Sequence, residues 1–507
     1  MEEKSEVDIH QQVEQWGVFE LGLSDAAKES AGKPVKAIFT NGRRVREAYA
    51  FEDGSGAGRI RFMPDEVGVW EYEIAGSSAD QPVHQGRIEC TAPHPGNHGP
   101  VRIVSDKDFA YADGTPFIPF GTTSLKWYDG EAFEETIAAL ASSPFNKVRM
   151  AAGPADSDME KLEAAIRRLM ELGIEADLLL DCREGGAEAE RFLAEAVARL
   201  AAFRNVWWSL VLPEELDPPG RQERLRRSLP LLQERDPYRH PLTVQSSDPM
   251  SDFSFHPITH VSLRAGDPSQ VSHYAGMHGK PVLVEECGCE GNAPSLWGSL
   301  PPEELVNRIW NAVCRGGYAA HGEMFTRSGG ASWHSHGGSL TGEAAPRLAF
   351  LRGILEEAPL GLRFMPAYYD AATIGLEGEY YLQYHGIHRF STKQLRVPEG
   401  RYAADLIDVW NMQITPFSEE FVGSEVFVAL PERTNLALRI RRVDSPLQQA
   451  PRRYDTARIT DPPLLADRLQ GQADRQNTIS PDEENENFIS ERERANKNRG
   501  GRSDAQQ

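Results

Sequence analysis

The stretch Val282-Leu283-Val284-Glu285-Glu286-Cys287-Gly288 is an apolar run of strand length that ends directly in two carboxylates and a glycine. Strand alternation places Glu286 on the same side as Val284 and Val282. The strand predicted in this stretch is Pro281–Glu285. Seven further β runs alternate with segments of helical periodicity: Phe117–Thr122, Asn146–Met150, Glu175–Leu180, Asn205–Leu210, Pro241–Gln245, His260–Leu263 and Gly317–Gly322. This alternation is typical of a parallel sheet, and eight such strands predict a closed (β/α)8 barrel.

Helices are predicted between these strands wherever apolar residues recur every three or four positions. The five segments with this period are Asp158–Leu172, Ala187–Phe203, Arg221–Arg235, Pro302–Arg315 and Gly342–Glu357. Short β runs separated by turn residues predict an Ig-like β-sandwich at 13–92, before the barrel at 101–358, and a second β-sandwich at 360–443. Residues 445–507 have few large apolar side chains, so we expect a disordered tail.

The charge and composition of the chain argue against several classes of protein. The 507-residue chain has 54 Lys and Arg against 76 Asp and Glu, a formal net charge of −22, which argues against a nucleic-acid partner. Met1 to Gln12 does not resemble a secretory signal, and apolar runs are too short for a membrane span, so we expect a soluble cytoplasmic protein. The five scattered cysteines fit reduced thiols. No cofactor is indicated, and the oligomeric state stays open.

Candidate reacting groups lie where barrel enzymes carry them, at the carboxyl ends of the strands. Glu286 ends the seventh strand and Glu214 follows the fourth. Two carboxylates that face each other across a sugar are what glycoside hydrolysis needs. Either acid of the Glu285-Glu286 pair could instead cap the next segment or pair with an arginine. Glu214 and Glu215 could equally form a solvated loop.

A sugar-binding subsite is predicted from aromatic and polar residues near the ends of the first, second and eighth strands. The candidates are Trp127, Arg149, His321, Glu323 and Trp333. Tryptophan faces stack well on sugar rings, although a buried Trp127, or an Arg149 paired with a glutamate, is a fair alternative. His334 and His336 lack a third and a fourth ligand at recognisable spacing, so no metal site is predicted.

Several motifs, in order along residues 13 to 443, resemble those of the apiosidase-like glycoside hydrolases, bacterial barrel proteins with a β-sandwich on either side. They are Trp16-Gly17-Val18-Phe19-Glu20, Arg61-Phe62-Met63-Pro64, Pro95-Gly96-Asn97-His98-Gly99-Pro100, Asn205-Val206-Trp207-Trp208-Ser209-Leu210, Glu286-Cys287-Gly288, His321-Gly322-Glu323 and Asp408-Val409-Trp410-Asn411-Met412. The resemblance implies a retaining hydrolase of imported plant-derived oligosaccharides. It makes Glu286 the nucleophile and leaves Glu214 as a substitute acid and base.

The mouth of the barrel departs from that pattern at four places. Relatives carry Asn-Glu, with the glutamate as acid and base, where this chain has Leu212 and Pro213, and proline cannot donate a proton. Asp181-Cys182-Arg183-Glu184 replaces a His-Pro-Tyr-Asp-like run, and Trp333-His334-Ser335-His336 replaces Trp-Trp-Ser-Lys. Arg264 stands where a glutamine is common. Since the scaffold motifs are intact, either the substrate has changed or catalysis has been lost.

Two alternatives to a glycoside hydrolase follow. One is a non-catalytic carbohydrate-binding or scaffold protein on a degenerate glycosidase fold, in which loss of Glu286 would leave sugar binding largely unchanged. The other is an interaction protein that works through its tail, in which deleting Ser445 to Gln507 would remove partner capture and leave the barrel folded.

Overall fold

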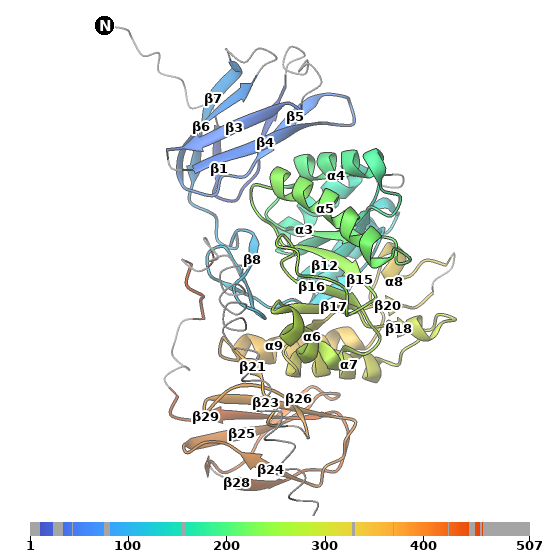
Figure 1. Cartoon of the computed structure of the whole chain (residues 1–507). Coiled ribbons are helices and arrows are strands. Elements are labelled where there is room, and N and C mark those ends of the chain that lie inside the picture. The colour runs from blue at the N-terminus through green and yellow to red at the C-terminus, as the bar shows by residue number, and fades with distance from the viewer. Residues whose placement is uncertain are drawn as a thin grey trace, which may run out of the picture. The chain divides into compact units, whose positions relative to one another are not determined.

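Eight parallel strands form a closed ring in the structure, a computed structural model (Figure 1). The structure describes residues 11–23, 34–42, 44–75, 82–154, 158–326, 330–368, 370–423, 425–445, 452–456 and 459, all within one unit, 1–459. The strands pair in chain order: β11 (Gly121–Thr123), β12 (Lys147–Ala152), β13 (Glu175–Asp181), β14 (Val206–Val211), β15 (Leu242–Ser246), β16 (Val261–Arg264), β17 (Val282–Glu286) and β19 (Tyr318–Ala319). A parallel bridge from Thr122 to His321 closes the ring, which confirms the predicted barrel.

Helices surround the barrel strands. They are α2 (Phe133–Ala141), α3 (Met159–Glu171), α4 (Gly186–Leu200), α5 (Pro218–Arg235), α6 (Val271–His278), α7 (Pro302–Cys314) and α9 (Ala344–Glu357). Loops carry the short helices η1 (Trp127–Asp129), η2 (Pro268–Gln270), η3 (Leu296–Gly298) and α8 (Trp333–His336), and the paired strands β18 (Glu290–Gly291) and β20 (Glu323–Met324). Periodicity predicted neither α2 nor α6. The reason is clear for α6, where only Val271 is buried. In the described ranges, no helix combines the length and hydropathy needed to cross a membrane.

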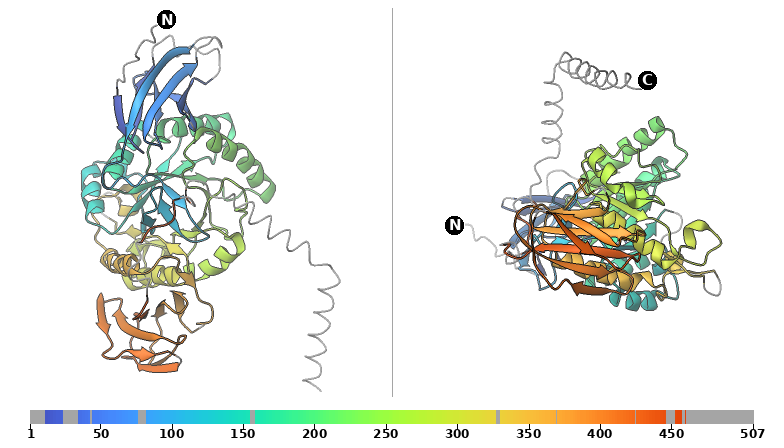
Figure 2. Two further views of the ribbon diagram at one scale, coloured as in Figure 1. Left: turned by 90° about the vertical axis from the view of Figure 1, so that its left-hand side faces the viewer. Right: turned by 90° about the horizontal axis from the view of Figure 1, so that it is seen from below.

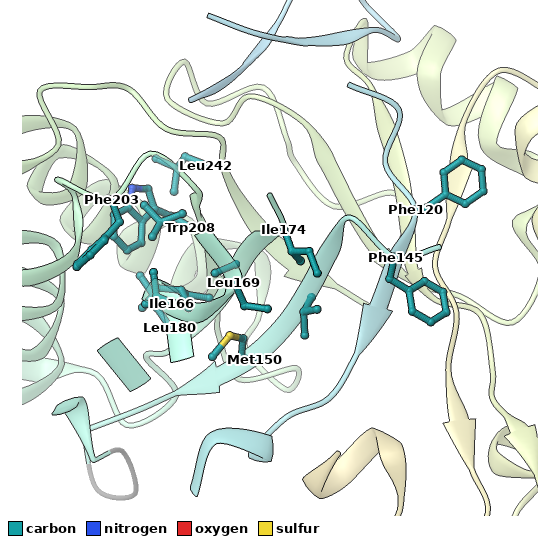
Figure 3. Close-up of a cluster of buried hydrophobic side chains, with 14 of the residues drawn as sticks. Phe120, Phe145, Met150, Ile166, Leu169, Ile174, Leu180, Phe203, Trp208 and Leu242 are labelled. Carbon is teal, nitrogen blue, oxygen red and sulfur yellow. The ribbon is translucent and has the colours of Figure 1, made fainter. Parts of the chain in front are cut away.

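The apolar core lies between the strands and this helical layer (Figure 3). Met150 of β12 and Leu180 of β13 pack with Ile166 and Leu169 of α3, and all four side chains are fully buried. Burying an aliphatic side chain of this size contributes about 1.5 to 3 kcal/mol. Because the helices cover the outer faces of the strands, the barrel is stabilised from outside, and its interior can hold polar side chains.

A small sheet covers the amino-terminal end of the barrel. It consists of β8 (Val101–Ile103), β9 (Phe109–Tyr111) and β10 (Pro116–Phe117). The rings of Phe109 and Phe117 lie 5.4 and 5.9 Å from the ring of Trp207, near the start of β14. The predicted first strand is therefore split, with its beginning in this sheet and its end in β11. The carboxyl ends of the barrel strands form the other rim.

The segment 445–507, for which we predicted disorder, lies almost wholly outside the described residues. Ser445, 452–456 and Ile459 are the part of it that the structure describes. The backbone N–H of Tyr454 donates to the carbonyl of Gly114 at 2.8 Å, beside β10. An ordered contact therefore extends further along the chain than composition indicates.

The amino-terminal β-sandwich is a single sheet that wraps into a barrel-like domain. Its strands are β1 (Gln11–Glu14), β2 (Phe19–Gly22), β3 (Lys36–Asn41), β4 (Arg44–Glu52), β5 (Gly58–Phe62), β6 (Gly68–Ala75) and β7 (Pro82–Thr91), paired in the order β1-β7-β6-β3-β4-β5-β2. The first part of β4 pairs with β3 and its end pairs with β5, so this strand passes between two layers. Phe39 and Phe62 stack between the layers with ring centres 3.9 Å apart.

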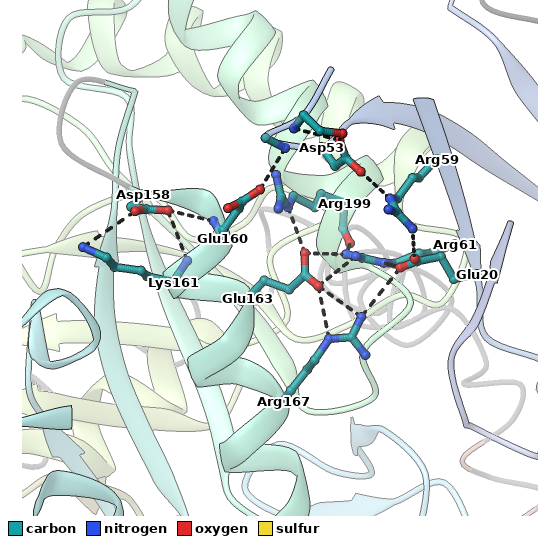
Figure 4. A network of polar contacts seen from close by, with 12 residues as sticks. Glu20, Asp53, Arg59, Arg61, Asp158, Glu160, Lys161, Glu163, Arg167 and Arg199 are labelled. Atoms are coloured by element: carbon teal, nitrogen blue, oxygen red, sulfur yellow. Dashed lines mark hydrogen bonds and ion pairs between the residues drawn. The ribbon is translucent and has the colours of Figure 1, made fainter. Parts of the chain in front are cut away.

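An ion-pair network joins this domain to the barrel helices (Figure 4). Arg61 of β5 contacts Glu20 of β2 at 2.7 Å and Glu163 of α3 at 2.8 Å. Arg199 of α4 reaches the other oxygen of Glu163 at 3.0 Å. The side chain of Arg61 is only 4% exposed, so these contacts are shielded from water and tie β5 to α3 and α4.

The carboxyl-terminal domain has two antiparallel layers (Figure 2). The larger contains β21 (Arg363–Phe364), β22 (Ala372–Leu376), β23 (Tyr380–Gly386), β29 (Leu436–Arg442), β25 (Arg401–Asp408), β26 (Gln413–Pro416) and, paired with β25, β27 (Phe421–Val422). The smaller contains β24 (Thr392–Arg396) and β28 (Glu425–Ala429). Tyr381, Leu395 and Tyr402 belong to its buried core. Tyr384 of β23 packs against Trp310 of α7 in a tilted arrangement, with ring centres 5.2 Å apart, and so joins the domain to the barrel.

Candidate functional site

A β-bulge near the end of β17 sets the direction of Glu286. Along the ladder between β16 and β17, Leu263 pairs with Val284, whereas Arg264 pairs with Glu286, so Glu285 is the extra residue. An extra residue re-aims the side chains that follow it. Simple alternation, which placed Glu286 on the side of Val284, therefore does not hold at this point.

Two arginines hold the carboxylate of Glu286. Arg264 Nε donates to Oε2 at 3.1 Å, and Arg149 Nη1 lies 3.6 Å from Oε1. The side chain of Glu286 is 10% exposed and that of Arg149 is fully buried. Burial lowers the pKa of Arg149, but the surrounding carboxylates, Asp177 first, outweigh burial and raise it. Glu286 therefore faces a permanently charged guanidinium from β12 and a second one from β16.

A buried network inside the barrel supports Arg149. Lys147 Nζ lies 2.6 Å from Asp177 Oδ2 and 2.8 Å from Glu285 Oε1. Ser209 donates to the other oxygen of Asp177 at 2.6 Å, and Arg149 Nε lies 3.3 Å from Oδ2. Burial alone would raise the pKa of Asp177, but Lys147 and Arg149 outweigh burial and lower it to about 2. Asp177 is therefore ionised throughout the neutral range and fixes the orientation of Arg149.

Glu214 reaches the same cluster from the loop after β14. Its Oε1 accepts hydrogen bonds from Ser247 Oγ at 2.6 Å and from Arg264 Nη1 at 3.0 Å. One guanidinium thus contacts both Glu214 and Glu286. Of the residues predicted from the sequence, the structure brings together Glu286, Arg149 and Glu214, with Arg264 as the link.

Three other candidates lie in the framework beneath the mouth. Trp127 is fully buried and stacks on Phe133 with ring centres 5.2 Å apart. Trp333 is also buried, and its Nε1 donates to Thr122 Oγ1 at 2.8 Å. His321 contacts the same hydroxyl at 3.0 Å, and burial lowers its pKa to about 3. The prediction that the two tryptophans offer a stacking face is corrected, because neither exposes a ring.

Glu323 has a similar supporting position. Its carboxylate accepts backbone hydrogen bonds from Thr341 and Gly342, each at 2.9 Å, in the loop before α9. Glu290 accepts two more backbone hydrogen bonds at the start of that helix. Both carboxylate oxygens of Glu323 are occupied and the residue is 1% exposed, so a sugar hydroxyl would have to displace the loop. The assignment of Glu323 to a sugar subsite stays a prediction, and its contacts give it a structural role as an anchor of this loop.

Sequence reasoning did not propose several residues of this cluster. Lys147 and Asp177 lie inside strands, Gln245 accepts from Arg149 Nη2 at 2.9 Å, and Ser247 binds Glu214. The sequence did contain a signal for the residues in the strands. Charged residues at alternate positions of an otherwise apolar barrel strand, such as Lys147 and Arg149 in β12, have to face the barrel interior.

His334 of α8 lies beside the cluster. Burial lowers its pKa, while the Glu286 carboxylate acts in the opposite direction. Its Nε2 is buried and has no hydrogen-bond partner among the residues that the structure describes. His336 is exposed. Across the described ranges, no group of three or more His, Cys, Asp or Glu side chains is arranged to hold a metal ion.

The closed barrel, its carboxylates at the strand ends and the β domains on both sides define a glycoside hydrolase-like TIM-barrel protein. The chain is similar to the crystal structure of a "putative glycoside hydrolase" from Bacteroides vulgatus, with 28% identity and a TM-score of 0.78 over 85% of this chain and 100% of that one. A second structure, described as "Glycoside hydrolase", shares the fold at 11% identity, with a TM-score of 0.58 over 70% and 99% of the two chains.

Two domain families also match parts of the chain. Residues 12–77 match a domain of unknown function, DUF5060, and residues 369–441 match another, DUF5605. Both matches lie in the β domains, outside the barrel. No curated protein matches the sequence.

Proposed function

We propose that the protein is a retaining glycoside hydrolase in which Glu286 is the nucleophile. The observation that carries this proposal is the position of Glu286, at the carboxyl end of β17 and held by Arg149 and Arg264. In a retaining reaction a carboxylate attacks the anomeric carbon, and a second carboxyl group gives a proton to the departing oxygen. The two groups lie about 5 to 5.5 Å apart in such enzymes. Glu214, which binds the same guanidinium as Glu286, is the candidate for the second group.

The proposed substrates are small plant-derived oligosaccharides. Support comes from the apiosidase-like motifs and from the similarity to the Bacteroides protein. The proposed place of hydrolysis is the cytoplasm, after import of the sugar.

The test uses aryl glycosides with good leaving groups, in a panel that includes furanosides and pyranosides. Such substrates need little help from an acid, so their turnover reports on the nucleophile. We expect turnover by the wild type, loss of turnover in Glu286→Gln and unchanged turnover in Glu215→Gln, because Glu215 is exposed and lies outside the ion-pair cluster.

A second candidate is a non-catalytic carbohydrate-binding protein. The observation that favours it is Pro213 at the place of the usual acid, together with the Arg264 contacts that occupy both Glu214 and Glu286. No turnover of any aryl glycoside by the wild type, combined with sugar binding that survives Glu286→Gln, would support this candidate and reject the hydrolase.

A further inference from the structure

Glu214, in the loop after the fourth barrel strand, is held in place by two side chains. Pro213 stands at the acid position, and the preceding Leu212 is turned into the hydrophobic core. The next residue, Glu214, has a 59% exposed side chain that nevertheless has two specific partners. An exposed glutamate is normally free to move, so two bonds from different strand ends require an explanation.

Both partners bind the same oxygen of Glu214. Ser247, directly after β15, donates to Oε1 at 2.6 Å, and Arg264, at the end of β16, donates to Oε1 at 3.0 Å. Within the described part of the chain, Oε2 has no hydrogen bond or ion pair. One oxygen is therefore fixed and the other is left to carry a proton or to meet a ligand.

Arg264 also sets the position of Glu214 relative to the nucleophile. Its Nε donates to Glu286 Oε2 at 3.1 Å while its Nη1 holds Glu214. The planar guanidinium is a rigid spacer, since its nitrogens have fixed separations and directions. A glutamine at this position, as is common in the apiosidase-like pattern, could not make the same charged contact with both carboxylates. Arg264 therefore links the two carboxylates directly.

We infer that Glu214, positioned by Ser247 and Arg264, is the acid and base of this barrel, an assignment that rests on the proposed hydrolase function. In the first step Glu286 attacks the anomeric carbon, the bond from that carbon to the leaving oxygen breaks, and the proton on Glu214 Oε2 moves to that oxygen. In the second step the Glu214 carboxylate takes a proton from water, whose oxygen attacks the anomeric carbon and releases Glu286. Ser247 and Arg264 are positioning residues.

The test measures kcat/KM for aryl glycosides that share one sugar and differ in leaving group, from dinitrophenol to phenol. For Glu214→Gln we expect kcat/KM within about threefold of wild type with dinitrophenol and a loss of about 10² to 10⁴ with phenol, because only the poor leaving group needs a proton. The dinitrophenyl substrate also shows that the variant is folded. Glu215→Gln should follow the wild type with every leaving group.

Ser247 allows the positioning role to be tested without touching Glu286. Ser247→Ala should lower kcat/KM for the phenyl glycoside about tenfold or more and leave the dinitrophenyl value unchanged. Ser247→Thr, which keeps the hydroxyl group, should restore the phenyl value. A purely structural role would lower both values together.

Azide gives a second readout for the base step. In Glu214→Ala, azide should raise kcat for the dinitrophenyl glycoside and yield a glycosyl azide, because this small anion attacks the covalent intermediate without needing a base. In the wild type it should change kcat little.

The following outcomes would overturn the assignment of Glu214 as the acid and base. Equal losses for all leaving groups in Glu214→Gln, or a leaving-group-dependent loss in His334→Gln with none in Glu214→Gln, would remove Glu214 from this role while the hydrolase remains. Wild-type protein that turns over no glycoside would reject the hydrolase and the acid together.

Discussion

Replacing Lys147 with methionine tests the buried charges that support the mouth of the barrel. Lys147 Nζ lies 2.6 Å from Asp177 and 2.8 Å from Glu285, and all three side chains are at most 1% exposed. In Lys147→Met, Asp177 keeps Arg149 and Ser209, but Glu285 loses its hydrogen-bond partner. Removing one partner of a buried ion pair costs about 3 to 5 kcal/mol, so the free energy of unfolding should fall by that amount.

The assay is denaturation in guanidinium chloride, followed by tryptophan fluorescence. Trp207, whose ring centre lies 5.2 Å from Lys147 Nζ, is one of the nine tryptophans that contribute to this signal. A second variant, Lys147→Met with Glu285→Gln, also removes the negative charge of Glu285, which Lys147→Met leaves unpaired. It should recover at least half of the lost free energy of unfolding. A single variant within about 1 kcal/mol of wild type would refute the idea that this cluster is held by its charge balance.

Three further predictions concern stability. Burial raises the pKa of Glu175 to about 8. The protonated side chain therefore contributes fully to the free energy of unfolding below pH 4.5, and this contribution is lost as the pH rises to about 8. In the wild type the free energy of unfolding should decline by up to about 1.4 kcal/mol per pH unit over this range. Glu175→Gln should remove this decline, measured by denaturation at pH 5 and pH 8. Glu323→Gln should lower the free energy of unfolding by about 1 to 2 kcal/mol, by calorimetry, with KM unchanged, because the carboxylate anchors a backbone loop. Arg61→Met should lower the free energy of unfolding by about 3 kcal/mol in denaturation, since Arg61 is a buried cation between Glu20 and Glu163. Arg61→Met with Glu163→Gln should lose more, because Glu163 also binds Arg167 and Arg199.

Distinct results would contradict these three expectations. An unchanged pH slope in Glu175→Gln would mean that this side chain is already ionised in the folded protein. A raised KM with unchanged stability in Glu323→Gln would return Glu323 to the sugar subsite. A smaller loss in the double variant than in Arg61→Met would show that Arg167 and Arg199 do not compensate the Glu163 charge.

The barrel was predictable because buried parallel strands are nearly continuous apolar runs. The strand predicted at Pro281–Glu285 is a typical example, and the structure places it one residue further along, at Val282–Glu286. The helix α6 was not predictable, because it buries only Val271 and so has no periodic apolar face. Where a helix lies largely against solvent, its sequence has little pattern to detect.

The candidate site was predictable in its position but less so in its composition. Glu286 could be placed at a strand end, but the bulge that turns it depends on pairing with β16, which no single strand encodes. Trp127 and Trp333 were assigned to a stacking surface because a tryptophan that binds sugar and a tryptophan that fills a core have similar neighbours in the sequence. Only the packing of the helical layer decides between the two positions.

The most direct measurement is covalent trapping of the nucleophile. The protein is incubated with 2-deoxy-2-fluoro glycosides that carry good leaving groups, and the labelled residue is located by peptide mass spectrometry. Retaining hydrolysis predicts the mass of one glycosyl group on Glu286 at the end of β17, and no label in Glu286→Gln. A label on another carboxylate, or none from any sugar that the wild type turns over, would contradict the assignment of Glu286.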